Sequence, residues 1–158
     1  MNAFDLQIFL DDLLRLGVAL LLGGLIGAER QLAGQSAGLR THVMVAMGAT
    51  VLTLVGLSVA GDQQVTRVVQ GVASGIGFIG AGAILRARGD EKVKGLTTAA
   101  SIWMSAAMGT AAGLGELPLA AAAGCAGLFV LAVLRPASRW LAKRAAKQTT
   151  SVGERDSL

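Results

Sequence analysis

Several charged side chains in this sequence flank long apolar stretches at positions that could form a polar site. Glu29 and Arg30 end one apolar run, Arg40 opens the next, and Lys94 precedes a run that begins Leu96-Thr97-Thr98. A helix N-terminus presents free backbone amides and a partial positive charge, so it favours an anion. We therefore predict an inner cluster that holds a lipid phosphate, a partner's carboxylate or simply Glu29. Its members are Glu29, Arg30, Arg40, Thr41, Lys94, Thr97 and Thr98.

Carboxylates are also the groups that a hard divalent cation prefers. Asp11 and Asp12 precede Arg15 by four and three residues, a spacing that predicts a local ion pair on one helix face. The alternative is a cation site, because Mg²⁺ binds carboxylate oxygens and retained water. Glu29 is the third candidate metal ligand. The only histidine, His42, is expected at the membrane interface, with a ligand or pH-responsive role as the alternative.

Polar residues recur at helical spacing on two of the apolar runs. Arg67, Gln70 and Ser74 follow an i, i+3, i+7 pattern, and so do Thr98, Ser101 and Ser105. Hydroxyls on membrane helices usually bond to their own carbonyls or to a neighbouring helix. Both stripes therefore predict helix contacts first and the lining of an ion pathway second.

Long apolar runs are the elements that must position these residues. Hydrophobic residues make up 53% of the 158, and the mean hydropathy is +0.62. Five runs are each long enough to cross about 30 Å of hydrocarbon. We predict an all-α integral membrane protein, a glycine-rich bundle of five transmembrane helices spanning 1–134, followed by a basic cytoplasmic tail at 135–158. The predicted spans are Ile8–Ala28, Val43–Ala60, Val68–Leu85, Leu96–Gly115 and Leu117–Leu134.

The basic residues predict the orientation of the chain. If the N-terminus lies outside, all 14 lysines and arginines except Arg15 and Arg67 fall on the cytoplasmic side. That asymmetry predicts an N-out, C-in topology. The net charge of +4 is then explained by anionic lipids of the inner leaflet, and no nucleic acid partner is needed.

Glycine is unusually dense in the third run. In a bilayer the helix is enforced, and glycine on one face allows a neighbouring helix to approach closely. We predict such packing and self-association of the chain, with another membrane protein as the alternative partner. The predicted packing positions are Gly24, Gly27, Gly71, Gly75, Gly77, Gly80 and Gly82.

Four sequence blocks carry a family resemblance. In chain order they are GGLIGAER, GLRTHVMVAMGA, SGIGFIGAGAILR and VKGLTTAASIW. Together they resemble the MgtC/SapB family of bacterial inner-membrane proteins, in its short SapB-like branch. Two departures stand out. Gly71 occupies a position where many members have glutamine, and the 24 residues after the fifth run lead us to expect the short branch rather than the ACT-like domain of longer members.

The resemblance implies a role in growth at low Mg²⁺ in the bacterial inner membrane, by one of two classes of mechanism. One is direct transport of Mg²⁺, and the other is modulation of a partner. No carboxylate lies in the middle of any apolar run, which favours a modulator, because a dehydrating divalent cation needs such oxygens. An enzyme or a cofactor is not expected, since the sequence shows no nucleophile with a base, no phosphate loop and no metal-ligand cluster.

Overall fold

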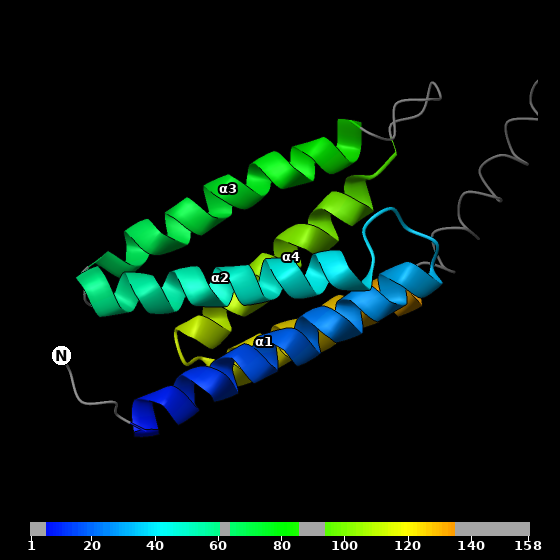
Figure 1. The fold of residues 1–158 in the computed structure, drawn as a ribbon. Helices are drawn as coiled ribbons and strands as arrows, with labels where there is room; N and C mark the ends of the chain where they lie inside the picture. The colour runs from blue at the N-terminus through cyan, green and yellow to red at the C-terminus, as the bar shows by residue number, and fades with distance from the viewer. Residues whose placement is uncertain (1–5, 61–63, 86–93, 135–158) are drawn as a thin grey trace, which may run out of the picture.

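The protein is a bundle of helices that run back and forth (Figure 1). A computed structural model describes residues 6–60, 64–85 and 94–134. Consecutive helices run in opposite directions. One end of the bundle holds the loop 33–38 and the start of α4, and it is called here the Gln35 end. The opposite end holds the connection from α4 to the last helix, and it is called the Arg15 end. The helices are α1 (Leu6–Leu32), α2 (Leu39–Ala60), α3 (Val65–Leu85), α4 (Leu96–Gly113) and the last helix, Leu117–Leu134.

Each of the five predicted runs corresponds to a helix, but two helices extend further toward the Gln35 end. α1 continues past Ala28 to Leu32, and α2 begins at Leu39 rather than Val43. Glu29, Arg30 and His42 therefore lie within helices. The predicted tail at 135–158 lies outside the described residues.

Three of these helices are long and apolar enough to cross a membrane: α2, α3 and the last helix. α1 carries charges near both ends, at Asp11, Asp12 and Arg15 and at Glu29 and Arg30. α4 has no charged residue, but its serines, threonines and glycines lower its hydropathy. The membrane prediction is thus supported by three helices, while five spans and their orientation remain predictions.

α4 is the central helix. It contacts α1, α2 and α3, and its Met108 sulfur lies near Gly124 of the last helix. Its many small residues explain this position, because small side chains let several backbones approach one helix. Its buried residues are Thr98, Ser101, Ile102, Ser105, Ala106, Met108, Gly109, Thr110, Ala112 and Gly113.

Close backbone approaches hold α2 against both α1 and α4. A Cβ built on Gly27 would lie 2.7 Å from Leu39 Cα, and one on Gly113 would lie 3.0 Å from Thr50 O. A Cβ on Gly109 would collide with the carbonyl of Ala46. A side chain at any of these three glycines would force α2 away from its neighbour, so they are close packing positions of the bundle.

The glycines of α3 behave differently. A Cβ on Gly71, Gly75, Gly77 or Gly82 would meet nothing within 4 Å. Gly80 and Gly24 would make only ordinary contacts, at 3.7 Å from Ala99 and 3.8 Å from Val43. The predicted close packing of α3 through its glycines thus does not occur among the described residues of one chain, because α3 lies at the edge of the bundle and, among α1 to α4, contacts only α2 and α4.

Candidate functional site at the Gln35 end

A buried arginine marks the Gln35 end of α1. Arg30 is 3% exposed and contacts Glu29 Oε2 through both Nε and Nη2. Its place in the last turn of α1 is favourable, because the C-terminal end of a helix carries partial negative charge. A buried cation also needs a counter-charge, and Glu29 supplies it.

The end of α1 also determines where Gln35 lies. Gly34 adopts a left-handed conformation, with φ 69°, and the amides of Gly34 and Gln35 donate to the carbonyls of Gln31 and Arg30. These bonds form a Schellman motif, which stops the helix and turns the chain. Gln35 Oε1 then accepts a 3.3 Å hydrogen bond from the Thr98 hydroxyl of α4.

His42 joins α2 to α4 in the interior. Its side chain is fully buried, with Nδ1 2.8 Å from Gly38 O and Nε2 3.0 Å from Ser101 Oγ. The Ser101 hydroxyl also lies 2.8 Å from the carbonyl of Thr98. His42 therefore lies between helices rather than on a polar surface of the chain.

The residues in these contacts come from α1, the 33–38 loop, α2 and α4, and they are called here the buried cluster, although Glu29 and Gln35 are partly exposed. The Gln35 amide, which donates to Arg30 O, links the ion pair to the rest. The buried cluster consists of Glu29, Arg30, Gln35, His42, Thr98 and Ser101.

Half of the buried cluster was not expected: Gln35, His42 and Ser101 were absent from the predicted inner cluster. Two sequence signals point to these residues. Gly34 as a helix stop indicates that Gln35 begins a turn, and the i, i+3 spacing of Thr98 and Ser101 places both on one face of a helix.

The remaining predicted members of the inner cluster lie nearer the surface. Arg40, Lys94 and Thr97 are exposed, and Thr41 is partly buried. α4 begins after Gly95, whose φ is 92°, and no side chain caps it. The Thr98 hydroxyl bonds to Gln35 Oε1 and does not cap its own helix.

The two polar stripes differ in burial. Thr98, Ser101 and Ser105 face the interior, and Ser105 Oγ has no hydrogen-bond partner among the residues that the structure describes. Arg67, Gln70 and Ser74 are all exposed on the chain surface. Within the part of the chain that the structure describes, the α4 stripe is therefore buried in the bundle and the α3 stripe is exposed.

The predicted acidic site near the Arg15 end is not assembled as expected. Arg15 Nη1 donates to Gly113 O at 2.8 Å, so this side chain supports the end of α4. Within residues 6–60, 64–85 and 94–134, no ion pair joins Arg15 to Asp11 or Asp12. The same ranges contain no group of three His, Cys, Asp or Glu side chains able to hold a metal.

Comparison with known proteins agrees with the four sequence blocks. The MgtC family matches residues 16–140. The chain belongs to the MgtC family. It is 48% identical over 118 residues to Protein MgtC of Brucella abortus (strain 2308), covering 75% of this chain and 49% of that protein.

Two other relatives of this MgtC family chain show the same pattern. Protein MgtC of Salmonella typhimurium (strain LT2) is 44% identical over 127 residues, covering 80% of this chain and 54% of that protein. Protein SrpB of Synechococcus elongatus is 44% identical over 113 residues, covering 64% and 62%. The chain thus spans about half to two thirds of the length of these relatives. No solved structure matches it significantly.

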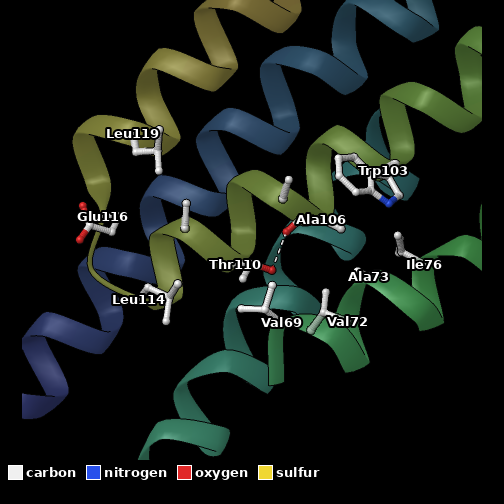
Figure 2. Close-up of a pocket in the computed structure, with 12 residues that line it drawn as sticks. Val69, Val72, Ala73, Ile76, Trp103, Ala106, Thr110, Leu114, Glu116 and Leu119 are labelled. Carbon is white, nitrogen blue, oxygen red and sulfur yellow. Dashed lines mark hydrogen bonds between the residues drawn. The ribbon is translucent and has the colours of Figure 1, made fainter. Parts of the chain in front are cut away.

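This MgtC family chain also has an apolar crevice away from the buried cluster (Figure 2). It encloses about 210 Å³ between α3, α4 and the start of the last helix, with Glu116 at one edge. The Thr110 hydroxyl in its wall donates to Ala106 O at 2.9 Å. A crevice with so few available polar atoms suits a lipid chain or an apolar helix better than a hydrated ion.

Proposed function

We propose that this protein is a multi-pass protein of the bacterial inner membrane that supports Mg²⁺ homeostasis during growth at low Mg²⁺. It acts as a modulator of a membrane partner rather than as a carrier. All five helices span the bilayer in this proposal, with the Gln35 end in the cytoplasm. Family membership and the basic residues of the predicted inner segments support it.

One observation favours a modulator. Glu29 is the only carboxylate of the buried cluster, and Arg30 already engages it. A nearby guanidinium also repels a divalent cation, and the cluster's remaining polar side chains are an amide, an imidazole and two hydroxyls. Mg²⁺ keeps much of its water and prefers carboxylates, so this cluster is a poor binding site for it.

The test separates transport from physiological effect. Purified protein in liposomes that contain a Mg²⁺-sensitive dye should give no more influx than empty liposomes. Deletion of the gene should nevertheless impair growth when Mg²⁺ is scarce. Glu29→Gln should reduce complementation, because it leaves the buried Arg30 without its counter-charge, whereas Glu116→Gln, at an exposed loop position, should complement fully.

Direct transport of Mg²⁺ is the alternative function, and the residues of the polar stripes are the ones that would line a pathway. A saturable Mg²⁺ influx that disappears in Glu29→Gln or Asp11→Asn would contradict the modulator proposal. An influx without saturation would indicate a pore, with Gln70, Ser74 and Ser101 as the lining to substitute next.

Self-association through α3 is part of the same proposal. α3 carries four glycines with open space around them and the exposed Phe78. Helices in lipid associate by close packing at glycines, so a second copy of this chain would find a fitting surface there. The exposed Arg67, near the start of α3, would then lie toward the outer face. The alternative occupant of this surface is another membrane protein.

A further inference from the structure

Three short contacts surround His42 and Ser101, and they need three protons if all of them are hydrogen bonds at the same time. A neutral ring and the Ser101 hydroxyl supply two. Gly38 O can only accept, so Nδ1, 2.8 Å away, carries a proton. Ser101 has one hydroxyl proton, but its oxygen lies near both His42 Nε2, at 3.0 Å, and Thr98 O, at 2.8 Å. If Ser101 donates to Thr98, Nε2 must also carry a proton, and the ring is then an imidazolium.

We propose that His42 and Ser101 form a reversible proton-binding site that links α2 to α4. In the neutral form Nδ1 is protonated, and the Ser101 hydroxyl donates to the bare Nε2. When Nε2 takes up a proton, it becomes the donor, and the Ser101 hydroxyl rotates to donate to the Thr98 carbonyl. No bond other than N–H forms, and no helix has to move.

The charged form has the stronger bond between the helices. A hydrogen bond from an ionised donor is about twice as strong as one between neutral groups. Protonation at Nε2 thus strengthens the contact between His42 on α2 and Ser101 on α4. The site lets proton concentration change how firmly these helices are joined.

Few ionisable groups face this site from the helices packed against it. α1 contributes Arg30, which opposes an added positive charge, and Glu29, which favours one. α2 itself carries only Arg40, which is exposed, and Lys94 precedes α4, whose own residues are not ionisable. α3 has only Arg67, near the Arg15 end, and the last helix only Cys125.

Because the chain contains a single histidine, one spectrum reports on this site. The probe is ¹⁵N-histidine-labelled full-length protein in lipid nanodiscs, measured by NMR across a pH series. We expect a neutral ring with its proton on Nδ1 and a bare Nε2, and loss of the bare-nitrogen signal at lower pH. Circular dichroism over the same series should show unchanged helix content. A neutral ring protonated on Nε2, or one that stays neutral to the lowest pH at which the protein remains folded, would overturn the proposal.

Two serines of α4 provide a matched pair of variants. Ser101→Ala removes the hydrogen-bond partner of Nε2 in both ring forms. The charged form loses more stabilisation than the neutral form, so the midpoint of the NMR titration should fall by about one pH unit. Ser105→Ala changes a buried serine whose hydroxyl has no hydrogen-bond partner in the described part of the chain, and it should leave the midpoint unchanged. Equal midpoints in the parent and Ser101→Ala would contradict the proposed role of Ser101. The tautomer measured in the parent decides the proposal even if Ser101→Ala fails to fold.

Discussion

α3 and α4 are alike in their small residues and in the spacing of their polar residues, but they differ in position: α4 is central and α3 lies at the edge of the bundle. Both are rich in glycine and alanine, and both carry polar residues at i, i+3, i+7. α4 buries its stripe among α1, α2 and α3, whereas the residues of the α3 stripe are exposed. Small residues therefore show that a helix face can be approached closely, but they do not show whether the neighbour belongs to the same chain.

The largest expected effect comes from filling the closest helix contact. Gly109→Leu should prevent folding, because even a Cβ at Gly109 would collide with the Ala46 carbonyl of α2. Gly75→Leu, on the open face of α3, should leave the folded monomer intact. Size-exclusion chromatography and circular dichroism in detergent compare the two variants. A folded Gly109→Leu protein would show that α2 and α4 do not pack as described.

Truncating large side chains should give the next largest difference. Met108→Ala should lower the free energy of unfolding by about 2–5 kcal/mol, because Met108 is fully buried and its loss leaves a cavity. Phe78 is 85% exposed, so Phe78→Ala should change the unfolding free energy of the monomer by no more than about 0.5 kcal/mol. Reversible unfolding in mixed micelles measures both. Similar losses for the two variants would remove the distinction between α3 and α4.

The smallest expected difference concerns the two stripes. Ser101→Ala should cost about 1–3 kcal/mol of unfolding free energy, since it leaves the buried His42 Nε2 without a partner. Ser74→Ala should fall within about 0.5 kcal/mol of the parent, because Ser74 is exposed. The same unfolding assay applies to this pair. If both variants lost the same unfolding free energy, the α3 stripe would have to be buried in the folded protein as the α4 stripe is, which would contradict the contrast between the two helices.

Much of the fold could be predicted because the hydrophobic runs are long and their boundaries are charged. Runs of apolar residues located all five helices, and the sequence blocks identified the family. The boundaries at the Gln35 end were harder. Helical hydrogen bonding continues through the charged residues Glu29 and Arg30. Hydropathy marks the end of the apolar run, so it does not predict where the helix itself ends.

The site was predictable only where one helix carried the signal. Thr98 and Ser101 could be placed on one face of α4 from their spacing, and Glu29 and Arg30 are adjacent in the sequence. The partners of these residues depend on how helices distant in the chain pack, as His42 and Ser101 illustrate. Which glycines meet a neighbour depends on the same packing, so Gly109 and Gly75 could not be distinguished by sequence.

Cysteine cross-linking tests the contrast between α3 and α4 most directly. In a Cys125→Ala background, Gly75→Cys should give a covalent dimer when membranes are oxidised, because this position faces open space on α3. Ser105→Cys should remain monomeric, since Ser105 is fully buried inside the chain. A dimer formed by Ser105→Cys but not by Gly75→Cys would contradict the account, because the central helix would then be the one that meets a second copy.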